Sequence, residues 1–221
     1  MEISRDQIKQ AVIEAGSSDE GFFHFPENEN GLYLQQDPDE YADFVHYMAT
    51  QLPPSKFSLD IGIASGGQTK FLRDYYKVEK TIVLDIGMHE AFVHWERIKP
   101  TVNTNLVLEL IMDSHSKEAR KALLPYQGQI DFTFIDGDHS YKGLMQDIEL
   151  AKEIVKKDCV FVFHDTGAVP DCVRVFKELE KDPDFEMLAN FDTRFGISVW
   201  KYLAVNGPKT GIRKKISKLL S

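Results

Sequence analysis

Cysteine is scarce in this sequence. Only Cys159 and Cys172 occur among 221 residues, and they form neither a C-x-x-C pair nor a zinc-binding spacing. This excludes the small disulfide-stapled scaffolds and the cysteine-rich zinc modules, and it suits a protein of the reducing cytosol. Cys159 opens an apolar run, so we expect it to pack in a hydrophobic core.

Long apolar runs and a surplus of positive charge are also missing. No stretch is long enough to span a bilayer, and the N-terminal residues MEISRDQIKQ are too polar for a signal peptide. The 35 acidic and 26 basic side chains give a net charge of −9, which disfavours a nucleic-acid-binding surface. We therefore expect a cytoplasmic globular protein with no nucleic-acid partner.

Two sequence motifs are absent as well. The chain has neither the G-x-G-x-x-G fingerprint of dinucleotide-binding folds nor the G-x-x-x-x-G-K-[ST] phosphate loop, and no G-x-S-x-G arrangement is present. A nicotinamide-dependent oxidoreductase is therefore disfavoured, although it stays the main rival enzyme class. A binding module without turnover is the other alternative.

What the sequence does contain is an alternation of strand-like and helix-like segments. The strand-like segments are short, apolar and rich in β-branched and aromatic residues, at 57–61, 81–85, 105–111, 130–135 and 159–164, with two closing strands at 186–190 and 197–203. Helical segments lie between them, at 69–76, 117–124, 143–157 and 171–182. The alternation predicts an α/β fold with a doubly wound, mostly parallel sheet covered by helices on both faces.

Two helices are expected before the first strand. A capping pattern at Ser4 and a stop at Gly16 bound the first. The second is expected to begin with Asp37 as N-cap, Pro38 at the first helical position and Glu40 closing a capping box.

Acidic residues recur where the predicted strands end. Five successive strands are followed by at least one aspartate: Asp60, Asp85, Asp113, Asp136 with Asp138, and Asp165. In open α/β sheets the ligand crevice lies just outside the carboxyl ends of the strands. Turn and cap chemistry explains one or two such residues, but five at one rim indicate a binding site.

The loop after the first predicted strand indicates the kind of ligand. Residues 60–67 read DIGIASGG, and glycines there let a ligand approach the backbone. The acidic Asp60 would repel a pyrophosphate and suits a cofactor with a cationic end, an ammonium and a sulfonium. Asp85 lies at the right distance along the chain to bind ribose hydroxyls at the end of the second strand.

These motifs resemble those of class I S-adenosylmethionine-dependent methyltransferases. The similarity is carried by LYLQQDPDEYADFV, LDIGIASGGQT, FIDGDHSYKGLMQDIELA, FVFHDT and FGISVW, within residues 31–203. It is most specific in IDGDHSY and HDT, which mark a group similar to O-methyltransferases of sugars and natural products. The resemblance implies a Rossmann-like sheet of seven strands whose last strand is antiparallel. It divides the chain into an N-terminal helical cap (1–52), a methyltransferase domain (53–205) and a basic tail (206–221).

The resemblance also implies the site residues. The residues expected to bind S-adenosylmethionine are Asp60, Gly62, Ala64, Ser65, Gly66, Asp85, Asp113, Ser114 and Asp136. By analogy with metal-dependent relatives, Asp136, His164 and Asp165 are expected to hold a divalent cation, Mg²⁺ or Mn²⁺. The cation would lower the pKa of an acceptor hydroxyl, and a base would take its proton. Asp138 and His139 are equal candidates for that base.

The expected activity is methyl transfer to a hydroxyl of a small-molecule or glycan acceptor. Other histidines, among them His89 and His115, are expected to be surface or packing residues. Phe22, Phe23, Phe25 and Tyr33 are expected to form either a lid or a hydrophobic cap. The basic amphipathic tail suits docking on the acidic body or, as an alternative, peripheral contact with an anionic membrane. A homo-oligomer is left open.

Overall fold

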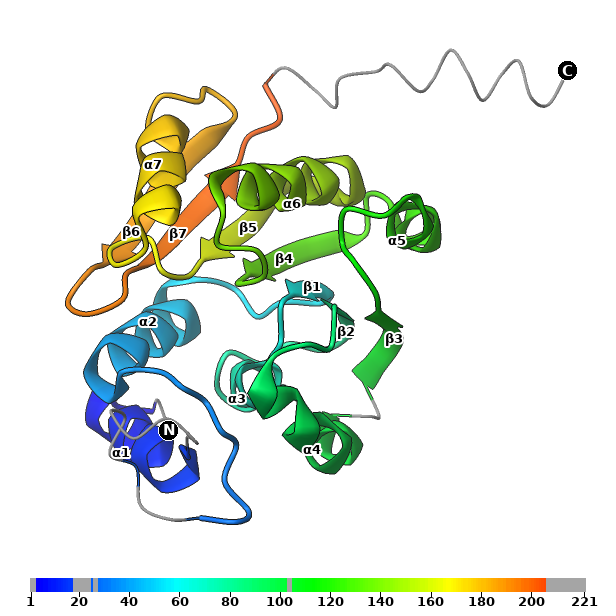
Figure 1. Ribbon diagram of the computed structural model, residues 1–221. Coiled ribbons are helices and arrows are strands. Elements are labelled where there is room, and N and C mark those ends of the chain that lie inside the picture. Colours follow the sequence, from blue (N-terminus) through cyan, green and yellow to red (C-terminus); the bar gives the residue numbers. More distant parts are fainter. Residues whose placement is uncertain (1–2, 18–24, 26–27, 103–104, 206–221) are drawn as a thin grey trace, which may run out of the picture.

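A seven-stranded sheet forms the centre of the molecule. The computed structural model describes residues 3–17, 25, 28–102 and 105–205 (Figure 1). The strands are β1 (Ser58–Ile61), β2 (Thr81–Asp85), β3 (Leu106–Ile111), β4 (Ile130–Ile135), β5 (Val155–Phe163), β6 (Phe185–Phe191) and β7 (Ile197–Tyr202). Their order is β3-β2-β1-β4-β5-β7-β6, and β7 alone runs antiparallel to both of its neighbours. The predicted Rossmann-like fold is confirmed.

The strand order creates the ligand crevice. The chain builds outward from β1 to β2 and β3, then returns to place β4 on the other side of β1. The connections after β1 and β4 therefore leave the sheet in opposite directions, which opens a crevice at their carboxyl ends. Every residue of β1 and β2 is buried, as expected of strands covered on both faces.

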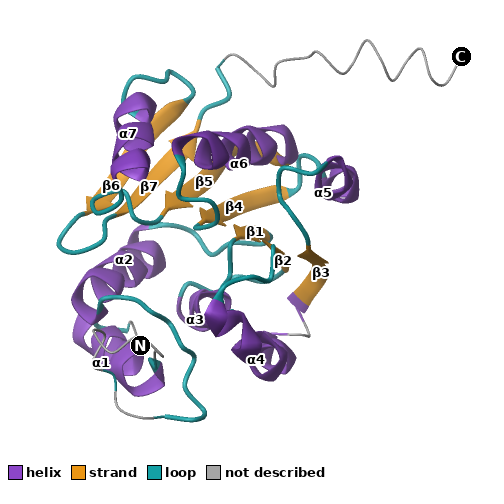
Figure 2. Ribbon diagram, in the orientation of Figure 1, coloured by secondary structure: helices purple, strands orange, loops and turns teal. Residues whose placement is uncertain are grey.

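Helices cover both faces of the sheet (Figure 2). The helices are α1 (Arg5–Ala15), α2 (Pro38–Gln51), α3 (Gly67–Tyr75), α4 (Trp95–Val102), α5 (Lys117–Leu123), α6 (Tyr141–Ile154) and α7 (Pro170–Leu179), with short 3₁₀ helices η2 (Glu90–His94) and η4 (Leu124–Tyr126). Helices α5 to α7 pack on one face and α1 to α4 on the other. Cys159 is fully buried in the hydrophobic core between the sheet and helices α5 to α7, as predicted.

The N-terminal helices pack directly on the sheet. Apolar residues of α1 and α2 share a core with Phe132 and Phe134 of β4 and with residues of β5 and β7. The predicted caps at Ser4 and Asp37 are confirmed, and Pro38 begins α2 as expected. The predicted role of Glu40 in a capping box is wrong, because its carboxylate turns away from the helix start and accepts hydrogen bonds from residues 194–196.

One boundary differs from the sequence-based expectation. Helix α6 ends at Ile154, and β5 begins at once with Val155, so Lys156 and Lys157 are strand residues rather than the last turn of a helix. Among the described residues, no helix is long and apolar enough to cross a membrane. The predicted amphipathic tail and the aromatic residues Phe22 and Phe23 lie outside the described residues.

Candidate functional site

A cavity of about 650 Å³ opens at the carboxyl ends of the central strands. The loops after β1, β2, β3, β4 and β5 all contribute to its wall, together with residues 33–36 and Phe195. Of the aspartates predicted at strand ends, those that line it are Asp85, Asp113, Asp136, Asp138 and Asp165. The sequence-based expectation of an acidic rim is therefore confirmed for four of the five strands.

The glycine-rich loop after β1 lines the cavity. Gly62 has a φ of +77°, and a Cβ atom there would lie 2.1 Å from the carbonyl oxygen of Asp136. Only glycine fits this combination of left-handed backbone and close approach. Ala64 also lines the cavity, and Gly66 is the N-cap of α3. The loop therefore presents backbone rather than side chains to a ligand.

Asp85 holds this loop in place. Its Oδ2 accepts hydrogen bonds from the backbone N–H groups of Ile63 (2.7 Å) and Ala64 (3.2 Å), and its Oδ1 accepts one from Gly87 (2.6 Å). The side chain is 7% exposed and lines the cavity. Each carboxylate oxygen has two lone pairs, so Asp85 retains acceptor capacity for the ribose predicted there.

Asp60 lies behind the loop rather than on the cavity wall. Its Oδ2 accepts a hydrogen bond from the Thr69 hydroxyl (2.7 Å), and its Oδ1 is buried without a hydrogen-bond partner. Burial raises the pKa of this carboxyl to about 6, although the bond from Thr69 opposes the shift. A cationic group arriving at the loop would favour the ionised form of Asp60.

Ser65 connects the loop to the segment that precedes α2. Its hydroxyl lies 2.7 Å from the carbonyl oxygen of Leu32 and 2.9 Å from that of Tyr33. The Arg97 guanidinium donates to the carbonyl of the adjacent Gly31. Residues 31–36 are thus fixed beside the cavity, and the Ser65 hydroxyl is used within the protein rather than being free for a cofactor.

The loop after β3 contributes another part of the cavity wall. Asp113 and Ser114 line the cavity, as does His115. The Ser114 hydroxyl donates to Oδ1 of Asp147 (2.6 Å), and Nε2 of His115 lies 3.2 Å from the same oxygen. Asp147 belongs to α6 and is fully buried, which raises its pKa. It therefore fixes the loop predicted to lie beside the adenine.

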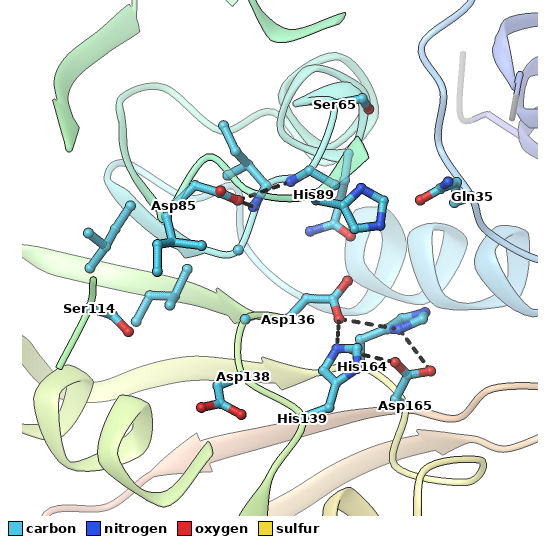
Figure 3. A pocket seen from close by; sticks show the side chains of 18 of the residues that line it. Gln35, Ser65, Asp85, His89, Ser114, Asp136, Asp138, His139, His164 and Asp165 are labelled. Carbon is cyan, nitrogen blue, oxygen red and sulfur yellow. Dashed lines mark hydrogen bonds and ion pairs between the residues drawn. The ribbon is translucent and has the colours of Figure 1, made fainter. Parts of the chain in front are cut away.

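Two carboxylates and two imidazoles meet at the ends of β4 and β5. We refer to Asp136, His139, His164 and Asp165 as the carboxylate–histidine cluster (Figure 3). His139 Nε2 lies 3.2 Å from Asp136 Oδ1 and 3.4 Å from Asp165 Oδ2. His164 Nδ1 lies 3.6 Å from Asp136 Oδ1 and 3.4 Å from Asp165 Oδ1. Each carboxylate therefore faces both histidines.

The charges of this cluster shift one another. Burial raises the pKa of Asp136, but His164 and His139 outweigh it and lower the pKa overall. The hydrogen bond to Asp136 raises the pKa of His139. Burial lowers the pKa of His164, yet the nearby Asp136 and Asp165 outweigh this effect and raise it to about 9. The cluster therefore attracts positive charge.

The donor atoms that lie together differ from the predicted metal ligands in one residue. One donor atom each from Asp136, His139 and Asp165 lie within 4.8 Å of one another, a spacing that suits a metal ion. His164 Nδ1 faces the same carboxylates but is buried, and its Nε2 lies 2.8 Å from Gln36 Oε1. His139, predicted as a base, thus stands in the donor set, while His164 lies behind it.

Asp138 lies apart from the cluster (Figure 3). Its Oδ1 accepts a hydrogen bond from the backbone N–H of Ser140 (2.8 Å), which lowers its pKa. Ser140 is the N-cap of α6. The carboxylate therefore supports the turn into this helix, whereas the helix cap itself, a role that the sequence left open for Asp138, belongs to Ser140.

Several cavity residues were missed by sequence reasoning. His89 and His115 line the cavity rather than lying on an unrelated surface, and both follow strand ends, so the strand-end rule could have found them. Gln36 and Phe195 also line it, but Gln36 precedes α2 and Phe195 lies in the β6–β7 loop, so neither follows the carboxyl end of a parallel strand. No signal in the sequence placed them there.

Known proteins are similar to this chain in two ways. Residues 59–166, just under half of the chain, match the model of a family described as a methyltransferase domain. A candidate RNA methyltransferase from Pyrococcus horikoshii shares the fold with a TM-score of 0.57 and 11% identity, over 94% of this chain and all of the other. A candidate O-methyltransferase from Klebsiella pneumoniae gives 0.55 and 16%, over 90% of each chain. No curated protein matches the sequence significantly.

The two kinds of similarity have different weight. The structural neighbours are too distant in sequence to show more than the fold. The family match covers β1 to β5 and ends at Thr166, so it includes the glycine-rich loop, Asp85 and the carboxylate–histidine cluster. Residues 33–36 and the β6–β7 loop lie outside it. The methyltransferase-domain match, the fold and the strand-end cavity agree with one another, and together they support S-adenosylmethionine-dependent methyl transfer.

Proposed function

We propose that this protein transfers the methyl group of S-adenosylmethionine to a hydroxyl oxygen of a small-molecule or glycan acceptor, assisted by a divalent cation. The observation that carries the proposal is the convergence of Asp136, His139 and Asp165 at one end of the cavity. The opposite end holds Asp85 and Ser114, where the ribose and adenine are expected. Cofactor and acceptor would thus meet at Asp136.

The residues of the cluster fit a metal ion. Two carboxylates and an imidazole form a donor set that suits Mg²⁺ or Mn²⁺. Nδ1 of His164 lies 3.6 Å from Asp136 and 3.4 Å from Asp165, so these two carboxylates stabilise positive charge, either a proton on His164 or a bound cation. A bound cation would lower the pKa of the acceptor hydroxyl and orient it. Asp136 and Asp165 would hold the cation, with His139 as the third ligand.

His139 and Asp138 remain the two candidates for the group that takes the acceptor proton. The geometry favours His139. The hydrogen bond to Asp136 raises the pKa of His139, and its side chain is partly exposed to the cavity. Asp138 is engaged with Ser140, and its lowered pKa makes it a weaker base. His139 can take the proton only if its Nε2 is not bound to the cation, because a neutral imidazole bound through Nε2 carries its own proton on Nδ1; with His139 as a ligand, Asp138 is the base.

An acceptor with several hydroxyl groups fits the wall of the cavity. Gln35, Gln36 and Gln68 line it, and amide side chains both donate and accept hydrogen bonds. A nucleic-acid acceptor, which the Pyrococcus horikoshii neighbour would suggest, is opposed by the net charge of −9. A small molecule or glycan is therefore the better candidate.

Calorimetry tests the proposal directly. S-adenosylmethionine is titrated into the protein with Mg²⁺ present and again after chelation, and Mn²⁺ is titrated separately. We expect cofactor binding in both conditions and a metal-binding heat that disappears in Asp136→Ala. Formation of S-adenosylhomocysteine with a panel of glycans and phenols then identifies the acceptor. Failure to bind S-adenosylmethionine would overturn the proposal, and binding without any metal heat would remove the cation from it.

A further inference from the structure

Glu40 is a buried carboxylate whose role nothing in the matched domain explains. It lies in the first turn of α2 and is 1% exposed. Its Oε1 accepts hydrogen bonds from the backbone N–H groups of Arg194 (2.7 Å) and Gly196 (3.1 Å), and its Oε2 accepts one from Phe195 (3.0 Å). Three consecutive N–H groups thus converge on one anion, in the manner of a backbone nest.

The segment that Glu40 holds is the loop between β6 and β7. Phe195 lines the cavity, and its ring centre lies 6.0 Å from that of His164. Gly196 has a φ of +89°, and a Cβ atom there would lie 2.1 Å from the backbone nitrogen of Gly167. The loop therefore packs tightly against the segment that follows β5, and this close backbone contact restricts its conformation.

This packing reaches the carboxylate–histidine cluster. The backbone N–H of Thr166 donates to Gly196, and that of Gly167 donates to Phe195, at 3.1 and 2.8 Å. Asp165, immediately before them, has a φ of +60°, a left-handed conformation that aspartate adopts more readily than most residues but that is uncommon outside glycine. Neighbouring hydrogen bonds help to hold such a conformation. The two hydrogen bonds from the next residues are part of that support.

We propose that Glu40 is a positioning residue: its carboxylate fixes the 193–196 loop, and the loop in turn fixes Asp165 and the Phe195 wall of the cavity. The N-terminal helix α2 thereby contributes to the active site through the C-terminal hairpin, although both lie outside the matched domain. A charged acceptor is needed because three N–H donors point at it. Neutral glutamine would turn an amide N–H₂ group toward at least one of them.

Hydrogen exchange in the wild-type protein is the first test, because it needs no variant to fold. Backbone amides 194–196 lie in a connection between strands, where amides commonly exchange quickly. With Glu40 as their acceptor they should be protected to an extent comparable with β7. Fast exchange of all three amides would overturn the proposal at this stage.

Glu40→Gln is the second test, compared with Asp39→Asn. Asp39 is adjacent on the same helical turn, but it pairs with Arg5 and Lys9 at the surface and does not contact the loop. In Glu40→Gln we expect loss of protection at 194–196 and a Mn²⁺ affinity lowered about 10-fold, the lower range for a supporting residue. S-adenosylmethionine affinity should change less than about 3-fold, and Asp39→Asn should match the wild type in both.

The two proposals fail in distinguishable ways. The Mn²⁺ measurement rests on the proposed metal site, whereas the exchange measurement does not. If wild-type protein binds no Mn²⁺, the metal assignment falls and Glu40 is judged by the exchange of 194–196 alone. If Glu40→Gln folds and keeps both the protection and the Mn²⁺ affinity of the wild type, Glu40 does not position the loop. Glu40→Asp should keep part of the protection, because it retains the charge with a shorter reach.

Discussion

The two ends of the cavity are built on different principles. At the cofactor end, hydrogen bonds to buried carboxylates fix the loops: Asp85 accepts from N–H groups of the glycine-rich loop, and Asp147 accepts from Ser114. At the other end, the wall is made of titratable side chains, Asp136, His139, His164 and Asp165, which shift one another's pKa. The carboxylates of the first end are used to fix loops, whereas the titratable side chains of the second end face one another across the cavity wall.

The two ends also differ in which outside residues support them. The cofactor end lies within residues 59–166, the segment that matches a methyltransferase domain, and its outside contact is made by Ser65 with the backbone carbonyls of Leu32 and Tyr33. The cluster lies in the same segment, and its outside contacts come from other residues: Gln36 contacts His164, and Glu40 holds the loop that carries Phe195.

Gly62 of the glycine-rich loop lies against the backbone of Asp136, so Gly62→Ala should disturb both ends of the cavity at once. A Cβ atom there would overlap the carbonyl of Asp136, in addition to the strain of a positive φ. We expect a loss of about 4 kcal/mol or more in the free energy of unfolding, together with loss of cofactor binding. Thermal unfolding and calorimetry measure the two effects.

Gly128→Ala is the matched control for Gly62→Ala. Gly128 has a φ of +76°, but no atom lies within 4 Å of the position its Cβ would take. It should lose only about 1–2 kcal/mol, the cost of the left-handed backbone. Equal losses in the two variants would show that the close approach of Gly62 to Asp136 is unimportant.

Asp165→Asn should impair the carboxylate–histidine cluster and leave the cofactor end intact. Asparagine tolerates the left-handed conformation of Asp165, so the backbone should be kept while one negative charge is removed. We expect the affinity for Mn²⁺ to fall by more than about 100-fold, beyond the loss that a supporting residue causes. S-adenosylmethionine affinity should stay within about 3-fold of the wild type, as measured by calorimetry.

The reverse variant is Asp85→Asn. It should weaken cofactor binding, because Asp85 holds the glycine-rich loop, and it should leave Mn²⁺ affinity unchanged. If Asp165→Asn and Asp85→Asn impaired both ligands alike, the two ends would not be separate units.

The sequence was sufficient to predict the sheet and the position of the cavity. Strands β1 to β4 begin and end within one residue of the predicted segments, because apolar runs buried on both faces are easy to recognise. Asp85, Asp136 and Asp165 were located by the same argument, since parallel strands bring their carboxyl ends to one edge. These are consequences of local pattern and topology.

What the sequence could not give depends on contacts between distant segments. Glu40 satisfied a local capping pattern, yet its carboxylate binds N–H groups more than 150 residues away. Asp60 was predicted at the cavity, but it is buried within β1, and its Oδ2 accepts a hydrogen bond from the Thr69 hydroxyl. For Glu40 a local preference was overridden by a tertiary contact, which spacing along the chain does not encode.

Asp60 offers a pH-dependent test of the cofactor end. Its folded-state pKa of about 6 lies above the unfolded value of about 3.9, so the folded protein binds the proton more tightly. The stability of the free protein should therefore be greatest below about pH 4 with respect to this group, and it should fall by about 2–3 kcal/mol as pH rises through 6. Asp60→Asn should remove this decrease, measured by urea unfolding at several pH values.

S-adenosylmethionine should reduce the same pH dependence in the wild-type protein, because its ammonium would favour the ionised carboxylate. Asp60→Asn should accordingly bind the cofactor more weakly while it is more stable without it at neutral pH. An unfolding free energy with the same pH slope in wild type and variant would show that burial does not raise the pKa of Asp60, and unchanged cofactor affinity in Asp60→Asn would show that it takes no part in the cofactor end.

The smallest effect is expected from Asp138→Ala. Asp138 accepts a hydrogen bond from Ser140 at the start of α6, so its loss should cost about 1 kcal/mol in the free energy of unfolding. Mn²⁺ and cofactor affinity should be unchanged, because Asp138 lies outside the cluster. His139→Ala should instead lower Mn²⁺ affinity and methyl transfer at little cost in stability. If Asp138→Ala folded normally but lost methyl transfer, Asp138 would be the base, and the chemistry would extend beyond the cluster to the turn before α6.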